Sequence, residues 1–98
     1  MFARVNTFQG KPEDTDRSTT IAVERAVPTL KTTDGSAGII ILGDRQTGKS
    51  LAITLWGSEE ALRASEEMAN KVRSETTDEA GEEIISVERY EVLHEERW

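Results

Sequence analysis

Hydrophobic and polar positions along this chain repeat with two different periods, and together they predict six elements of secondary structure. A repeat of two residues, or a short run of aliphatic residues, indicates a strand, whereas apolar residues three and four positions apart indicate a helix. The expected strands cover residues 2–8, 39–42, 51–56 and 83–93. The expected helices cover residues 14–30 and 59–72.

Local signals mark where these elements begin and end. Pro28 lacks a backbone N–H, so the first helix is expected to bend or end there. Ser58 is the expected N-cap of the second helix, and the acidic Glu59 and Glu60 suit the positive end of that helix. Residues 74–81 are acidic and show no periodicity, so they are predicted to form a loop before the last strand.

The segment Gly43–Ser50 reads GDRQTGKS, which matches the phosphate-binding pattern G-x-x-x-x-G-K-[ST]. This pattern binds phosphate when a strand leads through the loop into a helix, because the N-terminal amides of that helix point at the ligand. Residues 51–56 instead continue as a strand, and no capping residue begins a helix there. The segment is therefore predicted to be a hairpin loop, with a positive φ at Gly48 and a return strand that starts at Lys49.

The predicted order of elements is β-α-β-β-α-β, which is the ferredoxin-like arrangement of the α+β class with a four-stranded antiparallel sheet. Two helices cover only one face of such a sheet. Residues 39–42 are all apolar, and residues 51–56 carry Thr54 as their one polar residue, so both middle strands are apolar on both faces. A second copy of the chain is the simplest cover for the other face. We expect a homodimer with its sheets packed face to face.

Composition narrows the chemistry and the partners. The 98 residues suffice for one core, and we expect a single domain over 1–98. The chain has no cysteine and one histidine, so no thiol nucleophile and no metal site are expected. The net charge of −7 argues against nucleic-acid and anionic-membrane partners. No apolar segment is long enough to span a membrane, and the N-terminus lacks a signal-peptide layout, so a cytoplasmic location is expected.

Two segments resemble a known family. GIIIL at 38–42, which follows Pro28 and a glycine-containing loop, and TLWGSEEAL at 54–62 are similar to the dimeric α/β-barrel superfamily, and within it to the antibiotic biosynthesis monooxygenase-like domain. The resemblance extends over essentially the whole chain. It implies a ferredoxin-like subunit paired into a dimeric α/β barrel, with a mostly apolar cavity between sheet and helices. Monooxygenases of this superfamily act there on aromatic polyketides or quinol-like compounds without a cofactor.

The superfamily also includes haem-degrading enzymes, which carry an asparagine late in the first strand, where this chain has Asn6. Those enzymes also need a tryptophan and a histidine on the second helix. Here that helix carries Ala64, Ser65 and Met68 and no histidine. Haem degradation is therefore not expected, and no cofactor is predicted.

Four residues are candidates for lining a ligand pocket: Asn6, Trp56, Met68 and Tyr90. The amide of Asn6 can hold a substrate oxygen or bond a neighbouring loop. Trp56 and Met68 can line a cavity or fill the core, and Tyr90 can donate its hydroxyl to a ligand or hold it at the surface. No pair of carboxylates, no Ser-His-Asp set and no metal cluster is visible, so catalytic residues cannot be assigned from sequence.

Two further charged residues are expected to have ordinary structural roles. Arg4 is expected to pair with Glu88 or Glu91, if the first and last strands are neighbours. His94 lies in a charged tail and is expected to be solvated, unless the tail reaches a site on a partner chain.

Two functions fit these features. The first is a cofactor-independent monooxygenase that acts on a small aromatic or quinol-like compound in an apolar pocket. The second is a non-catalytic protein that binds a small ligand or a partner on the same dimeric fold. A closed cavity of roughly a few hundred Å³ with converging polar groups would favour the enzyme, and a filled interior would favour the binding protein.

Overall fold

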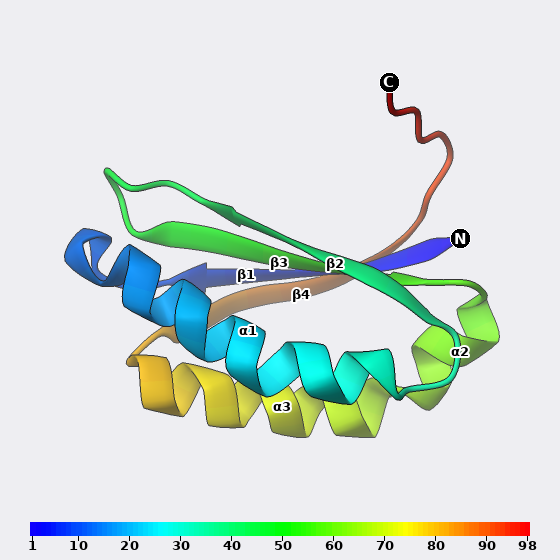
Figure 1. Ribbon diagram of the computed structural model, residues 1–98, viewed down its shortest axis with the longest axis horizontal. Helices are drawn as coiled ribbons and strands as arrows, with labels where there is room; N and C mark the ends of the chain where they lie inside the picture. The colour runs from blue at the N-terminus through cyan, green and yellow to red at the C-terminus, as the bar shows by residue number, and fades with distance from the viewer.

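The computed structural model describes all residues, 1–98, and confirms the predicted order of strands and helices (Figure 1). The strands are β1 (Phe2–Gln9), β2 (Ser36–Gly43), β3 (Lys49–Trp56) and β4 (Glu83–Glu91). The helices are α1 (Thr15–Lys31), α2 (Glu59–Ala64) and α3 (Glu66–Ala80), and a short 3-10 helix, Pro12–Asp14, leads into α1.

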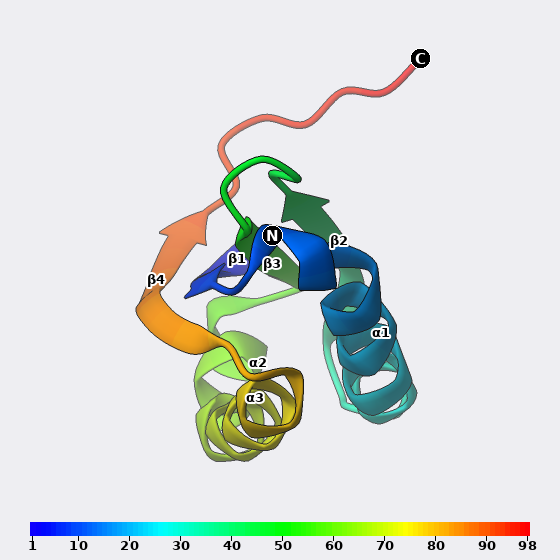
Figure 2. The same ribbon diagram turned by 90° about the vertical axis from the view of Figure 1, so that its left-hand side faces the viewer.

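The four strands form one antiparallel sheet in the order β2-β3-β1-β4. Figures 1 and 2 show α1 and α3 along the same face of this sheet, while the opposite face carries no helix. This is the predicted ferredoxin-like α+β fold, with a sheet that is open in the single chain. None of the helices combines the length and apolar character that a membrane span requires.

The loop that matches the phosphate pattern is a hairpin connection, as predicted. β3 begins at Lys49, directly after Gly48, which has a φ of 79°. A Cβ on Gly48 would lie 2.3 Å from the carbonyl oxygen of Gly10, so both the backbone conformation and the close approach require glycine. Because a strand follows the loop, the loop lacks the helix that the phosphate pattern requires directly after it.

Replacing Lys49 by alanine is expected to change the free energy of unfolding by less than about 0.5 kcal/mol, because this side chain is exposed and remote from the core. Chemical denaturation of both proteins measures the difference. A thermal stabilisation by nucleoside triphosphate and magnesium that the wild type shows and Lys49→Ala lacks would contradict the hairpin interpretation.

The second predicted helix starts as expected but is broken into two. The hydroxyl of Ser58 accepts a hydrogen bond from the backbone N–H of Ala61 at 3.1 Å and so caps α2. α2 and α3 meet at Ser65. The carbonyl of Leu62 accepts hydrogen bonds from the Arg4 guanidinium and from the Ser65 hydroxyl, both at 2.8 Å. A side chain from β1 thus ends α2, which local sequence cannot reveal.

The predicted loop over 74–81 is wrong, because α3 continues through it to Ala80 and ends at Gly81, which has a φ of 70°. The buried residues of this part are Thr76, Thr77 and Ala80. Each threonine hydroxyl donates to the carbonyl four residues earlier, at 2.7 and 3.0 Å. With their hydroxyls satisfied in this way, the threonines face the interior as apolar residues would. A scan for hydrophobic residues therefore misses this part of the helix.

α1 continues past Pro28 to Lys31, so of the predicted bend or end at Pro28 the end does not occur. Pro28 lies in the last turn, so it removes a single hydrogen bond close to the helix end. Leu30, in the same turn, is buried in the core and holds this turn against the sheet.

The period-two pattern of β1 correctly predicts its two faces. Residues on the helix-covered face of β1 are Phe2, Arg4, Asn6 and Phe8. The opposite face, here called the open face, carries apolar residues from three strands: Ala3, Val5, Ile40, Leu42, Leu51, Ile53 and Leu55. Ile40 and Leu42 are 36% and 47% exposed.

The core lies between the helix-covered face and the helices, and it is small. Its buried cluster consists of Leu30, Trp56 and Leu62, with Phe2 and Met68 among the half-buried residues packed against it. A core of this size leaves much of the apolar surface of the chain accessible, above all on the open face.

Candidate functional site

A cavity of about 70 Å³, here called the interior cavity, lies between the helix-covered face of the sheet and the helices α1 and α3. Its charged and amide-bearing residues are Arg4, Asn6 and Arg73. The rest of its wall consists of Phe8, Ala22, Ala26, Leu30, Ile39, Ala52, Thr54, Met68, Ala69, Val72 and Thr76. An engineered protein cavity that accepts benzene measures roughly 150 Å³. A ring-sized ligand therefore has to displace side chains here.

Arg4 reaches from β1, across the wall of the interior cavity, to the junction of α2 and α3. Its Nη2 donates to the carbonyl of Leu62 at 2.8 Å, to Oγ of Ser65 at 3.1 Å and to Oε1 of Glu66 at 2.8 Å. Its guanidinium carbon lies 5.5 Å from the centre of the Trp56 ring, a cation–π contact. The residue is 1% exposed, and its Nε has no hydrogen-bond partner.

The predicted pairing of Arg4 with Glu88 or Glu91 is wrong. β1 and β4 are neighbours, but the residue opposite Arg4 is Arg89, and Glu88 lies on the open face. Glu91 shares the helix-covered face and forms no ion pair. The carboxylate that Arg4 binds is Glu66, because the side chain of Arg4 points towards the helices.

Asn6 and Arg73 form the second polar part of the cavity wall. The Asn6 amide donates to the carbonyl of Ala52 at 2.8 Å, and its Oδ1 accepts from Nε of Arg73 at 2.8 Å. Nη1 of Arg73 donates to Asn70 at 2.7 Å. Both ends of the Asn6 amide are thus occupied, and Asn6 serves to hold Arg73 in place.

Three guanidinium groups gather around one carboxylate in this region, and we call Arg4, Arg73, Arg89 and Glu66 the cationic cluster. Hydrogen bonds from Arg89 lower the pKa of Glu66 from 4.5 to about 2, against the effect of burial and with help from Arg4. Burial, and then the charge of Arg4, lower the pKa of Arg73. The cluster therefore carries an excess of positive charge, although the chain as a whole has a net charge of −7.

Replacing Glu66 by glutamine is expected to destabilise the protein by about 2 kcal/mol at neutral pH. The pKa of Glu66 is depressed in the folded state, so its ion pairs contribute stability above about pH 5 that is lost as the pH falls through about 2. The full depression corresponds to about 3 kcal/mol. We lower this figure because 31% of the side chain is in solvent.

Urea denaturation at a series of pH values measures this contribution. The difference in unfolding free energy between wild type and Glu66→Gln is expected to shrink steadily between about pH 5 and pH 2. A difference that stays constant over this range would show that the ion pairs of Glu66 do not contribute as described.

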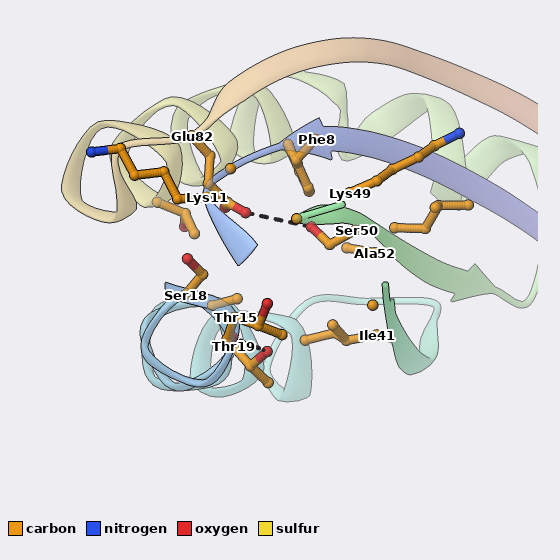
Figure 3. Close-up of a pocket in the computed structure, with 16 residues that line it drawn as sticks. Phe8, Lys11, Thr15, Ser18, Thr19, Ile41, Lys49, Ser50, Ala52 and Glu82 are labelled. Atoms are coloured by element: carbon orange, nitrogen blue, oxygen red, sulfur yellow. Dashed lines mark hydrogen bonds between the residues drawn. The ribbon is translucent and has the colours of Figure 1, made fainter. Parts of the chain in front are cut away.

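A second cavity, of about 40 Å³, lies at the end of the sheet next to the β2–β3 loop (Figure 3). Four of its lining residues belong also to the interior cavity: Phe8, Ala22, Ala52 and Thr76. The hydroxyl of Ser50 donates to the Glu82 carboxylate at 3.4 Å, and burial raises the pKa of Glu82. The two cavities therefore adjoin.

An open groove of about 310 Å³ lies on the outside, between the C-terminal part of α1 and the edge strand β2. Leu30 and Ile39 line both this groove and the interior cavity. The groove and the interior cavity therefore adjoin at these two side chains.

The four candidate residues lie in different places. Asn6 and Met68 line the interior cavity. Trp56 is fully buried in the core cluster and does not line the cavity. Its ring lies against the guanidinium of Arg4, which does line the cavity. Tyr90 lies on the open face, 52% exposed, and its hydroxyl donates to Glu88 at 2.9 Å. The sheet separates Tyr90 from the cavity, because side chains of a strand alternate between its faces.

The residues with the most pronounced electrostatics, Arg4, Arg73 and Glu66, are absent from the candidates drawn from the sequence. One signal was available for Arg4, which shares the helix-covered face of a central strand with Phe2 and Phe8. A charge at such a position has to find partners in the interior. No comparable signal exists for Glu66, whose partners come from two different strands.

Comparison with solved structures shows that the chain has the fold of the antibiotic biosynthesis monooxygenase-like proteins, as the resemblance predicts. A candidate antibiotic biosynthesis monooxygenase from Deinococcus radiodurans matches with a TM-score of 0.72 at 16% identity, over 100% of this chain and 98% of that one. SnoaB, a cofactor-independent oxygenase from Streptomyces nogalater, matches with a TM-score of 0.61 at 15% identity, over 96% and 94% of the two chains. A Streptomyces coelicolor monooxygenase, in complex with nanaomycin D, matches with a TM-score of 0.66 at 16% identity, over 96% and 92%.

Sequence comparison adds relatives whose functions are not described. No family model matches the chain. The uncharacterized protein Rv2557 of Mycobacterium tuberculosis is 30% identical over 92 residues, which are 94% of this chain and 41% of that protein. Rv2558 of the same organism is 33% identical over 73 residues, which are 74% of this chain and 31% of that protein. The chain thus spans less than half the length of these curated relatives.

Proposed function

We propose that residues 1–98 act as one domain that binds a small aromatic or quinol-like compound in the interior cavity and oxidises it with dioxygen without a cofactor. In this reaction the electron-rich substrate itself reduces dioxygen. One oxygen atom enters the product and the other leaves as water, so that a simple phenol and dioxygen give a quinone and water. The protein orients the substrate, excludes bulk water and stabilises negative charge.

The observation that carries this proposal is the convergence of Arg4, Asn6 and Arg73 on a cavity whose remaining wall is mostly apolar. The apolar wall suits an aromatic ring, and the guanidinium groups suit the negative oxygen of an activated phenol or quinol. Two neighbours in fold support the choice of reaction. One is a cofactor-independent oxygenase, and the other is a monooxygenase with nanaomycin D bound.

Oxygen uptake with a panel of hydroquinones and naphthols tests this proposal. The wild-type protein is expected to accelerate uptake in a saturable manner. Ala26→Leu, which fills the interior cavity from α1, is expected to reduce the acceleration at least about tenfold, because the ring loses its place. Val23→Leu is the matched control, since Val23 lies on the exposed side of the same helix. Uptake equal in Ala26→Leu and wild type would contradict the proposal.

A second function, binding of a small ligand without turnover, is favoured by one specific observation. The interior cavity measures about 70 Å³, and both ends of the Asn6 amide are already hydrogen-bonded. The Asn6 amide is thus already engaged in holding the protein together, with one N–H of its Nδ2 left over. Saturable binding of a hydroquinone without any oxygen uptake would select this second function.

We further propose that two copies of the chain pack open face to open face and so form the dimeric α/β barrel. No helix covers the open face in the single chain, where Ile40 and Leu42 are 36% and 47% exposed, and an apolar sheet face is normally buried. The lengths of the relatives fit this arrangement. The matched residues make up 41% of Rv2557, so that protein is long enough to hold a second domain of this size.

A further inference from the structure

We infer that the interior cavity takes its ligand as an anion, with the negatively charged oxygen at the Nε–H of Arg4. The ligand class is then a singly charged phenolate or carboxylate on a small apolar body. This inference rests on the proposed use of the cavity as a ligand site, and it does not depend on the oxidation that we propose there.

The unpaired donor is the first support. Among the buried side-chain nitrogens and oxygens of the chain, the Nε of Arg4 alone has no hydrogen-bond partner. A buried polar group without a partner is costly and rare in folded proteins, and each such group calls for an explanation. Nη2 of the same guanidinium already has three acceptors, at 2.8 to 3.1 Å, so the group is held in place and cannot turn Nε towards another acceptor. Less than 1 Å² of this Nε is accessible, so a ligand oxygen would meet it once side chains of the cavity wall move aside to admit a ring.

The sign of the local charge is the second support. Arg4 and Arg73 line the interior cavity, and the one carboxylate of the cationic cluster, Glu66, is shared between Arg4 and Arg89. Arg73 has hydrogen bonds to Asn6 and Asn70 only, both of which are neutral. An anion in the cavity would relieve the repulsion between Arg4 and Arg73, and the low dielectric of the interior strengthens that attraction.

The shape of the cavity limits the size and charge of the anion. Ala26, Leu30, Ile39 and Met68 form an aliphatic wall that suits a single ring or a short chain. Met68 is the flexible member of this wall and can move aside to admit a ring. A strongly hydrated, doubly charged anion would lose its water shell in a cavity whose wall is mostly apolar, so phosphate and sulfate do not fit.

The test uses 4-nitrophenol, whose visible absorption distinguishes phenol from phenolate and which needs no oxygen. At a pH slightly below the solution pKa of this probe, the wild-type protein is expected to increase the phenolate absorption in a saturable manner. Two competition measurements show which kind of ligand the cavity accepts. 4-Nitrobenzoate is expected to compete if any singly charged oxyanion fits, whereas neutral nitrobenzene is not. Absence of a spectral change with wild type, or competition by nitrobenzene equal to that by 4-nitrobenzoate, would overturn the inference.

Arg4→Lys isolates the Nε–H. Lysine keeps the positive charge near Glu66 and Ser65 but places a methylene group where arginine has its Nε–H. We expect this variant to weaken binding of 4-nitrophenolate by about 10- to 100-fold, the usual effect of removing a hydrogen bond to a charged group. Arg89→Lys is the matched control, because Arg89 contacts the same Glu66 but does not line the cavity. Equal affinities of Arg4→Lys and Arg89→Lys would overturn the inference.

Ala26→Leu provides a second variant in case Arg4→Lys fails to fold. It fills the cavity and leaves Arg4 in place, so it is expected to abolish the spectral change, and unchanged binding would place the anion elsewhere and overturn the inference. The outcome is separable from that of the proposed function. Phenolate binding without oxygen uptake by any hydroquinone would refute the oxygenase and leave the anion site standing. Oxygen uptake that is the same in Arg4→Lys and wild type would refute the anion site and leave the oxygenase standing.

Discussion

Replacing Trp56 by alanine is expected to lower the free energy of unfolding by about 4 kcal/mol, the usual cost of removing a large aromatic side chain from a core. Trp56 is 0% exposed and belongs to a buried cluster of only three residues, with Leu30 and Leu62. The change also removes the ring on which the Arg4 guanidinium rests and the hydrogen bond from the indole N–H to Thr54, at 3.0 Å. A domain of this size typically has a total stability of about 5–15 kcal/mol.

Thermal and urea unfolding followed by circular dichroism measure this loss, with an expected fall in Tm of roughly 15–30 °C. Trp98→Ala is the matched control, because Trp98 lies exposed in the C-terminal tail and its removal is expected to leave Tm unchanged. Trp56→Phe keeps a ring and is expected to fall between the two, so it gives a measurable value if Trp56→Ala does not fold. A loss of less than about 1 kcal/mol for Trp56→Ala would show that the core lies elsewhere.

The order and faces of the strands could be predicted because a strand exposes its pattern directly. Every second residue of β1 points to the same side, and this placed Arg4 and Asn6 opposite Ala3 and Val5 before any pairing was known. The hairpin was predictable for a related reason. Gly48 and the strand that follows it exclude the helix that a phosphate loop needs, and no distant residue alters that choice.

Helix ends were predicted less well, because tertiary contacts and polar residues decide them. α2 ends where the Arg4 guanidinium and the hydroxyl of Ser65 take the carbonyl of Leu62. The last turns of α3 bury Thr76 and Thr77 in positions where a hydrophobic pattern would show aliphatic residues. In both places hydrogen bonds compensate for the missing local signal.

The candidate site was predictable only in part, because its polar groups depend on contacts between distant segments. Asn6 and Met68 follow from strand and helix periodicity, and both line the interior cavity. Glu66 and Arg73 acquire their importance from Arg4 and Asn6, more than sixty positions earlier in the chain. Tyr90 is a candidate because its hydroxyl can bind a ligand, but the hydroxyl does not indicate which face of the sheet carries the residue. The register of β4 places it on the open face.

Replacing Ile40 by lysine is expected to convert the proposed homodimer into a monomer. Ile40 lies on the open face opposite Ile53 and is 36% exposed in the single chain, so its lysine variant is expected to fold. In a two-fold symmetric interface the substitution buries two unpaired charges, one from each copy. We expect the dimer dissociation constant to rise at least about 1000-fold, which corresponds to about 4 kcal/mol.

Sedimentation analysis of wild type and variants at micromolar concentrations measures this shift. Val23→Lys is the matched control, since Val23 is 43% exposed but lies on α1, away from the open face, and its lysine variant is expected to remain dimeric. Denaturation of Ile40→Lys separates loss of the dimer from loss of the fold. Because the dimer would also bury the other apolar residues of the open face, the wild-type protein is expected to gain stability with concentration, whereas Ile40→Lys is not. A wild-type protein that sediments as a monomer would leave this apolar face exposed and would exclude the dimeric barrel for this chain.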